Sequence, residues 1–501
     1  MEMDGCFWVA FAAMFVGSLS FLLFMKMNRQ SDSKSMSWPA GPRKLPIIGN
    51  LHQLQKGGPL VHVTLAEMSK QYGNIMTVWF GTRPTLVISD PGSAWEVLVT
   101  KASDYASRTL PYKSRFVTAN WRTLASSDFG TYWFILRKGV QASFFHPANV
   151  LAQATFQESD ASQLIRSIGE EAIRNDGVVK PLPHLRKSTV RLIGRLCFGP
   201  DFRDEKFVDA MDVLTEDTIL QTGHKSLGDV FAGLRHIPGF KQPFREAYDL
   251  KVRIEELIKP CIDRYRSKES AYLQFLLSQG SPLEVVIFNI FEMFLLAVDS
   301  TSLATTWALG FLIHDQQIQH RLYKELSEDG REGTLGIEEV SKMKYLHGLV
   351  KESTRMRPIA PLAVPHKAVK DTTLMGRRVR AGTSVIVNLY AVLHDATVWN
   401  EPHRFDPDRF LKNREQGEGE EEDAAAKKAT DRSFLPFGAG RRVCAGMELA
   451  KLHVALTLGN LVKAFEWSCA TEEKLPDLSE DLTFILRMKT PLLAKIVPRH
   501  S

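Results

Sequence analysis

The start of the chain stands out by its hydrophobicity. Residues 5–25 form a run without a charged side chain, long enough to cross a bilayer as a helix. A cleavable signal peptide is the alternative, but its apolar core is shorter and a small-residue cleavage site follows it. Acidic Glu2 and Asp4 precede the run, and basic Lys26 and Arg29 follow it. Because basic flanks stay in the cytosol, we expect a single span with the N-terminus in the lumen and the rest of the chain in the cytosol.

Beyond residue 45 the hydrophobic positions predict a helix-rich fold. Long amphipathic or apolar stretches predict helices at 149–174, 207–220, 244–267, 283–315 and 337–356. The stretch 283–315 is apolar nearly all round, which indicates a buried helix. Short β-branched runs with turn residues at 46–54 and 75–89 are consistent with strands of a small sheet.

The segment between the apolar run and the predicted helices contains the prolines of 38–42, which favour an extended spacer. No linker or repeat interrupts the sequence after it. We therefore expect a transmembrane anchor at 1–25, a basic and proline-rich hinge at 26–44, and one large body at 45–501. Residues 415–428, acidic and then rich in Ala and Lys, are interpreted as a surface insertion without chemistry.

Composition and charge limit the function classes. The 501 residues are 44% hydrophobic and 24% charged, which are globular values. A net charge of +6 is too small to argue for nucleic-acid binding. The five cysteines are scattered, odd in number and without a CxxC pair, which favours a reducing, cytosol-facing body.

One cysteine has a distinctive frame, Phe437-Gly-Ala-Gly440-Arg-Arg442-Val-Cys444-Ala-Gly446. A thiolate ligand to heme iron needs such surroundings. Gly440 and Gly446 let the backbone approach the ring and direct N–H groups at the sulfur. Arg442 can pair with a heme propionate, and Phe437 can cover the sulfur. The alternative is that Cys444 is an ordinary buried cysteine.

The frame resembles that of the cytochrome P-450 superfamily. The resemblance implies a mainly α fold with small β-sheets and a heme b cofactor whose iron takes its axial thiolate from Cys444. It also implies a buried network in which Arg409 joins Glu352 and Arg355, which share one helix face. Without the resemblance, the last two residues would be read as a common surface ion pair.

Further heme contacts follow from the same resemblance. Trp133 and Arg137 share one helix face, as in the helix with which the family contacts a propionate. His366 stands where the family often places another propionate contact; the alternative is a turn histidine.

The predicted buried helix carries an acid and an alcohol in sequence, Asp299 and Ser300. In the family such a pair relays protons to iron-bound oxygen. An acid on a buried helix is costly unless it has a partner or a task, so the alternative is an Asp299 that only caps or pairs. The sequence departs from the family's pattern at Leu296, Ala297 and Ser300, which makes the pocket wall bulkier.

The variant Asp299-Ser300 resembles a narrower group, from which Ala297 still departs. The segments 38–54, 298–302, 357–366 and 371–376 are similar to those of plant methylenedioxy-bridge-forming enzymes, which include canadine, stylopine and cheilanthifoline synthases. The resemblance implies a monooxygenase of plant specialised metabolism that closes the bridge from an ortho-methoxyphenol, using O2 and NADPH-derived electrons. The substrate would be a benzylisoquinoline alkaloid, a lignan or a phenylpropanoid.

Three alternatives stay open. The nearest is a hydroxylase or oxidative phenol-coupling enzyme acting on a related aromatic. The others are a heme-thiolate isomerase or peroxygenase that needs no reductase, and a membrane-bound heme or sterol binder without catalysis.

The resemblance also implies the pocket and the partners. Pocket walls are expected from the predicted buried helix at 283–315, called the distal helix below, from the segment after Arg357, and from two loops at 105–127 and 482–486. The expected pocket residues are Leu295, Leu296, Ala297, Ile359, Ala360, Leu362, Ala363, Val364 and Phe484. Because the chain has no flavin or nicotinamide fingerprint, electrons should come from NADPH–cytochrome P-450 reductase. The candidate docking residues are Arg137, Lys138, Arg441, Arg442 and Lys451, or these form an ordinary solvated basic surface. Anchor and hinge together imply the endoplasmic reticulum membrane.

Overall fold

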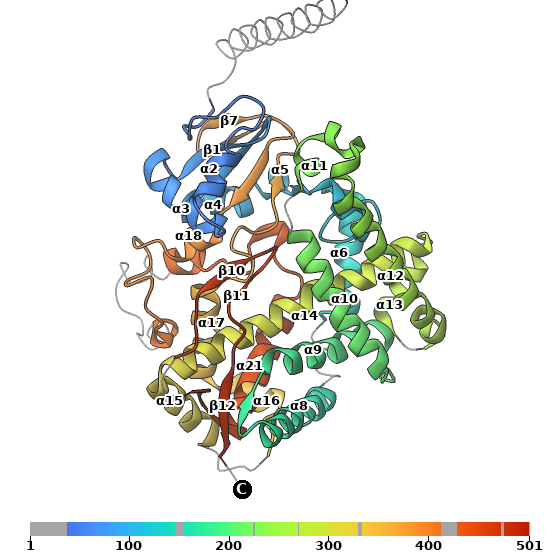
Figure 1. The fold of residues 1–501 in the computed structure, drawn as a ribbon, viewed down its shortest axis with the longest axis vertical. Coiled ribbons are helices and arrows are strands. Elements are labelled where there is room, and N and C mark those ends of the chain that lie inside the picture. The colour runs from blue at the N-terminus through green and yellow to red at the C-terminus, as the bar shows by residue number, and fades with distance from the viewer. Residues whose placement is uncertain are drawn as a thin grey trace, which may run out of the picture. The chain divides into compact units, whose positions relative to one another are not determined.

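The computed structural model of the chain describes residues 38–146, 154–223, 226–268, 270–328, 333–411, 428–471 and 475–499 (Figure 1). By their contacts the residues form two compact units, Met1–Ala40 and Gly41–Ser501, and the second unit is the subject below. The predicted anchor, most of the hinge and nearly all of the insertion at 415–428 lie outside the described residues. Within the described ranges, no helix has the length and apolarity needed to cross a membrane.

The body is mainly helical, as predicted. Its helices in chain order are α2 (Leu51–Lys56), α3 (Val61–Tyr72), α4 (Pro91–Trp95), α5 (Ala102–Tyr105), α6 (Thr131–Ser143), α8 (Ala154–Arg174), α9 (Pro181–Phe198), α10 (Glu205–Gly223), α11 (Leu227–Val230), α12 (Gln242–Tyr265), α13 (Ala271–Ser278), α14 (Leu283–His314), α15 (Gln316–Ser327), α16 (Ile337–Lys342), α17 (Lys344–Met356), α18 (Leu389–Leu393) and α21 (Met447–Ala464). Single 3-10 or π turns include η1 (Glu96–Thr100), η2 (Tyr112–Val117), η5 (Pro407–Phe410) and η6 (Gly440–Arg442).

Helix α14 runs through the middle of this body (Figure 1). Its first half packs into a core cluster with side chains of α9, α10, α12 and α13. Its second half packs into another cluster with α17 and α21. The helix ends at Asp315, whose carboxylate accepts hydrogen bonds from the N–H groups of Gln317 and Ile318, at 3.0 and 3.1 Å, and so caps α15.

The largest sheet has the strand order β1-β2-β8-β5-β3. Strands β1 (Ile75–Phe80) and β2 (Arg83–Ile88) form an antiparallel hairpin, β8 (Ser384–Val387) lies parallel to β2, and β5 (His366–Lys367) and β3 (Ser107–Arg108) complete the edge. This register places Arg108 opposite His366. The smaller sheets are β4 (Val178–Val179), β12 (Ala494–Pro498) and β9 (Phe465–Cys469); β10 (Glu480–Leu482) and β11 (Leu486–Met488); and β6 (Thr372–Leu374) and β7 (Arg377–Val379).

Two predicted elements need correction. The stretch 46–54 is no strand: Ile47 and Gly49 adopt left-handed backbone in a turn, and α2 begins at Leu51. The side chain of Asn50 holds this turn against the sheet by accepting from the N–H of Trp79 at 2.7 Å. The stretch 337–356 forms two helices because Met343 is extended, and the carboxylate of Glu325 caps the second one.

Candidate active site

The cysteine loop is held in a fixed shape by its glycines and its backbone. Gly438 and Gly440 have φ of 68° and 66°, which side chains rarely allow. A Cβ on Gly440 would stand 1.7 Å from the carbonyl oxygen of Leu98, so no other residue fits there. The N–H of Cys444 donates to the carbonyl of Phe437 at 3.0 Å, which closes the loop just before α21.

The four described cysteines differ in their surroundings. Cys197 and Cys261 are buried, whereas the side chain of Cys444 is exposed. Burial nevertheless raises the pKa of the Cys444 thiol, so protein atoms surround this accessible sulfur closely. The N–H of Gly446 and the charges of Arg137 and Lys451 act in the opposite direction and favour the thiolate. An accessible sulfur with these neighbours fits a metal ligand better than an ordinary core cysteine.

Arg442 reaches from this loop to the segment after β3. Its guanidinium donates to the carbonyl oxygens of Ala106, Leu124 and Ser127, at 2.7, 3.1 and 2.5 Å. Its centre also lies 4.6 Å from the ring centroid of Trp133, which is buried on α6. Burial lowers the pKa of Arg442 to about 10, although the charges of Asp128 and Glu292 act in the opposite direction.

A second buried guanidinium, that of Arg108, lies near the first. It donates to the carbonyl of Val364 at 2.6 Å, and its Nε has no partner among the described residues. Burial, and then repulsion by Arg442, lowers the pKa of Arg108 to about 9. The charge of Glu292 acts on both arginines, but among the described residues no carboxylate forms a salt bridge with either, so two cations in one buried region call for a further anion. The carboxylates of a heme meet that need, so the residues present fit the group.

His366 and Arg137 border the same region. His366 lies in β5, not in a turn, and its Nδ1–H donates to the carbonyl of Tyr105 at 2.9 Å. Burial, and then the charge of Arg108, lowers the pKa of His366 to about 3, so its ring is neutral. Arg137 donates to the carbonyl of Val443, next to the cysteine, at 2.9 Å.

The predicted acidic–basic network is assembled in the structure. Glu352 and Arg355 on α17 are fully buried and joined by two hydrogen bonds, at 2.7 and 2.8 Å. Arg409 donates to Glu352 at 3.3 Å, and Arg355 also binds the carbonyls of Leu393 and Pro402. The network therefore joins α17 to the chain around 393–410.

Asp299, on the distal helix α14, has a partner that the sequence did not suggest. Arg186 on α9 forms a salt bridge with its Oδ1 and another with Asp212 on α10, at 2.5 Å. Oδ2 of Asp299 has no partner among the described residues. Burial raises the pKa of Asp299, and the charge of Arg186 opposes this effect. The pairing alternative is thus realised for one oxygen only, and the second is buried without a hydrogen-bond partner among the described residues.

Between its exposed ends at Leu283 and His314, the surface of α14 is accessible at one place. Leu296 is 39% exposed, while the helix is buried to both sides of it. Ser300 lies one turn further and donates its hydroxyl to the carbonyl of Leu296 at 2.6 Å. Leu295 and Ala297 are only partly buried, so this face of the helix is not sealed by core packing.

The other predicted pocket residues divide into two groups. Ile359 and Phe484 pack against the same core cluster as Leu295, and the carbonyl of Ile359 accepts from the N–H of Leu486 at 2.8 Å. Ala360 and Val364 are partly buried on the same chain segment. Leu362 packs instead against the cluster under β1 and β2, which separates it from the rest.

Several residues of the site were missed. Arg108 and Arg186 give no local signal, because their partners lie far away in the sequence. Glu292 was detectable as a second acid within the apolar run of α14. It is buried and accepts a hydrogen bond from the N–H of Ala125 at 3.0 Å.

Comparison with known proteins agrees with this geometry. The family model for cytochrome P450 matches residues 39–495. The chain is 49% identical to (S)-canadine synthase of Coptis japonica, over 94% of both chains. It is 45% identical to cheilanthifoline synthase of Eschscholzia californica, over 99% of both. Piperic acid synthase of Piper nigrum is 46% identical over 98% of this chain and 96% of the relative.

A zebrafish cytochrome P450 solved with progesterone has the same fold, with a TM-score of 0.74 and 24% identity over 87% of this chain and 99% of that chain. The predicted resemblance is confirmed, and the chain belongs to the cytochrome P450 family of heme-thiolate monooxygenases.

Proposed function

We propose that this enzyme closes a methylenedioxy bridge on an ortho-methoxyphenol of plant specialised metabolism. The observation that carries the proposal is the 49% identity to a canadine synthase over nearly the whole chain. The relatives include an enzyme named for piperic acid, so the proposal names the methoxyphenol unit and not one pathway.

Cys444 would hold the heme iron, and Arg108, Arg137, Arg442, Trp133 and His366 would surround the propionates. The bound heme supplies oxygen activation and oxidation of C–H bonds. Gly440 and Gly446 would let the loop approach the heme ring, and Phe437 would shield the sulfur. Because Arg442 also holds three carbonyls of the segment 106–127, heme binding and the shape of that segment depend on one guanidinium.

Protons would reach the reaction through Asp299 and Ser300. The free Oδ2 of Asp299 can take up and release a proton while Arg186 keeps Oδ1 in place. Ser300 can redirect its hydroxyl from the carbonyl of Leu296 to a reacting group on the accessible face of α14.

In the reaction the methoxy carbon loses one hydrogen and the neighbouring phenol loses its O–H hydrogen. A bond forms between that carbon and the phenol oxygen. These two hydrogens, two electrons from a reductase and two protons reduce O2 to two water molecules. Leu295, Leu296, Ala297, Ile359 and Phe484 would hold the methoxy carbon in place, since positioning decides which bond reacts. Ala360, Leu362 and Val364 would complete the wall.

The same site could hydroxylate or couple a related phenol. We favour bridge closure because Leu296 and Ala297 make a bulky wall on the accessible face of α14, which suits a bound group with little freedom.

For the cellular setting, we propose that residues 5–25 anchor the chain once in the endoplasmic reticulum membrane. Residues 26–44 would form the hinge, and 45–501 the cytosolic catalytic domain. NADPH–cytochrome P-450 reductase would dock near exposed Lys138 and Arg441, with Lys451 alongside. Arg137 and Arg442 bind backbone carbonyls, which leaves them less available to a partner.

The deciding experiment is turnover in microsomes with plant reductase, NADPH and a panel of ortho-methoxyphenols that carry a trideuterated methoxy group. Bridge closure removes one deuterium and one hydrogen and adds no oxygen, which mass spectrometry detects. A product that gains oxygen, or loses two hydrogens and keeps all deuterium, would overturn the proposal in favour of hydroxylation or phenol coupling.

A further inference from the structure

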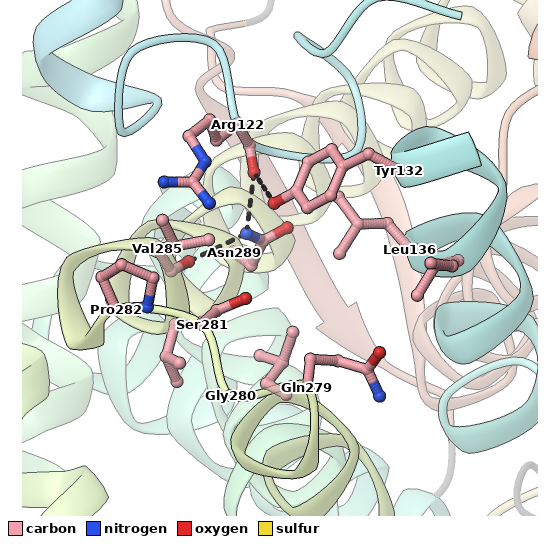
Figure 2. A pocket seen from close by; sticks show the side chains of 12 residues that line it. Arg122, Tyr132, Leu136, Gln279, Gly280, Ser281, Pro282, Val285 and Asn289 are labelled. Atoms are coloured by element: carbon pink, nitrogen blue, oxygen red, sulfur yellow. Dashed lines mark hydrogen bonds between the residues drawn. The ribbon is translucent and has the colours of Figure 1, made fainter. Parts of the chain in front are cut away.

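Two polar side chains on α14 face the loop 119–127 instead of the apolar core. Asn289 and Glu292 are one turn apart and are 0% and 5% exposed. The amide of Asn289 donates to the carbonyl of Arg122 at 3.1 Å, and the hydroxyl of Tyr132 donates to the same oxygen at 2.7 Å. Figure 2 shows these bonds beside a surface pocket of about 280 Å³.

Glu292 holds the next residues of the loop. One carboxylate oxygen accepts from the hydroxyl of Thr123, and the other accepts from the N–H of Ala125 at 3.0 Å. The Thr123 hydroxyl also lies 2.7 Å from that of Ser126. Asn289 and Glu292 thus fix successive residues of the loop on one helix.

The loop needs such support because its backbone is strained. Ala119, Asn120 and Trp121 have φ of 47°, 56° and 60°, which is the left-handed region. Residues other than glycine occupy this region at a cost and stay there only when surrounding contacts hold them. The fixed stretch from Arg122 to Ala125 follows directly after the strained one.

The far side of the loop meets the cysteine loop. Arg442 donates to the carbonyls of Leu124 and Ser127, which bracket the N–H group that Glu292 binds. The loop therefore lies between the distal helix and the cysteine loop, with a polar anchor on each side.

Glu292 is a buried, hydrogen-bonded acid on which the charge of Arg442 also acts. Among the described residues no basic group forms a salt bridge with it. Burial raises its pKa to about 7, and the hydrogen bonds from Thr123 and Ala125 act in the opposite direction. A buried acid costs free energy unless it is hydrogen-bonded or paired. Glu292 has two hydrogen bonds to the loop, and its charge also interacts with that of Arg442, which holds the other side of the loop.

We propose that Glu292 is a positioning residue that, with Asn289, fixes the loop 119–127 over the distal side and thereby sets how substrate is held. The placement of substrate beside this loop rests on the proposed function. The fixing of the loop rests on the contacts alone.

The test uses heme-loaded enzyme and compares Glu292→Leu, Glu292→Gln and Thr123→Val. Leucine keeps the bulk and removes both acceptors. Glutamine can still accept from the N–H of Ala125 and donate to Thr123, so it should restore the wild-type behaviour. Met293→Leu is the control, because this neighbour on the same buried helix makes no hydrogen bond to the loop.

The first readout is hydrogen–deuterium exchange of the peptide covering 118–128. Glu292→Leu should raise its exchange rate roughly tenfold, the effect of leaving one buried N–H unpaired, while peptides from 303–313 stay unchanged. Thr123→Val should raise it less, and should add nothing in the Glu292→Leu background. An unchanged loop in Glu292→Leu, or additive effects in the double variant, would overturn the proposal.

The second readout compares the changes in KM and in kcat, measured with an ortho-methoxyphenol that the wild-type enzyme converts to a bridged product. Glu292→Leu should raise KM roughly tenfold with a smaller change in kcat, because loop geometry affects binding first. Loss of kcat with unchanged KM would contradict the substrate-holding role. If the wild type forms no bridged product, the proposed function fails, while the exchange data still decide whether Glu292 fixes the loop.

Discussion

The buried charges at Glu352 and at Asp299 offer a direct comparison. Both carboxylates lie on long helices and meet arginines. Glu352 has both oxygens occupied, by Arg355, Arg409 and the N–H of Asp406. Asp299 has one oxygen occupied by Arg186 and one without a partner among the described residues.

This difference suggests a structural role for Glu352 and leaves the proposed catalytic role to Asp299. A fully paired carboxylate contributes rigidity and has no free site for a proton. A half-paired one is held in place and can still exchange a proton, at the cost of burying an unpaired atom. We expect substitutions in the first cluster to affect folding and heme loading, and substitutions in the second to affect turnover.

The largest effect should come from a substitution of Cys444, the predicted ligand of the heme iron. Cys444→Ser should remove the thiolate-type spectrum of the reduced, carbon monoxide-bound protein, because a serine oxygen cannot replace the sulfur as donor. Absorption spectra of purified protein test this. Cys469→Ser, which changes a partly buried cysteine in β9, should leave the spectrum intact. A thiolate-type spectrum in Cys444→Ser would refute the assignment of Cys444 as the iron ligand.

The next largest effect should come from breaking the network around Glu352. Glu352→Ala leaves Arg355 and Arg409 with backbone carbonyls but without their carboxylate, which costs about 3–5 kcal/mol of unfolding free energy. Heme incorporation during expression and denaturant unfolding measure the loss. Glu67→Ala, which removes an exposed ion pair with Lys70, should change stability by less than about 0.5 kcal/mol. Equal losses in the two variants would remove the distinction between the clusters.

Opening the half-paired cluster should leave folding intact. Asp299→Asn keeps an oxygen for Arg186 and removes the proton-exchanging carboxylate, so kcat should fall on the order of 10²-fold. Asp212→Asn changes the other carboxylate on Arg186 and should have a much smaller effect. Steady-state kinetics compare the two. Similar losses of kcat in the two variants would mean that turnover depends on the ion pairs of Arg186 and not on the unpaired oxygen of Asp299.

A smaller effect is expected at the alcohol. Ser300→Ala should lower the amount of product formed per O2 consumed, because the hydroxyl no longer directs a proton. Parallel measurement of O2 uptake and product tests the coupling. Ser302→Ala alters a buried hydroxyl near Thr189 and serves as the control. Unchanged coupling in Ser300→Ala would refute the relay.

The smallest effect concerns the pH dependence of stability. The pKa of Glu292 is raised from 4.5 to about 7 by burial. The folded state therefore keeps a proton that the unfolded chain releases, so this group's contribution to stability is full below about 4.5 and is lost as the pH rises to about 7. Glu292→Gln should flatten this part of the stability profile, as followed by denaturant unfolding between these values. A profile identical to that of the wild type would show that Glu292 is ionised in the fold.

Local patterns in the sequence were sufficient for α8, α10, α12 and α14 and for the cysteine loop, but α9 and α21 were not among the predicted helices. The apolar stretch that became α14 and the glycine frame around Cys444 each specify their structure within a short segment. Arg186 and Arg108 could not be predicted, because their roles arise from helices and strands that meet only in the folded chain. The turn at Ile47 escaped prediction because Asn50, and not the β-branched pair, determines the local backbone.

The close approach of Gly440 to the carbonyl of Leu98 has a consequence for the electronic state of the iron. With no space for a Cβ between them, the π turn η1 and the cysteine loop must move together. We therefore expect a change in the packing of η1 to reach the backbone around the sulfur, including the N–H of Gly446. Variants at Leu98, which is buried and remote in sequence, should shift the reduction potential of the enzyme while leaving every ligand in place.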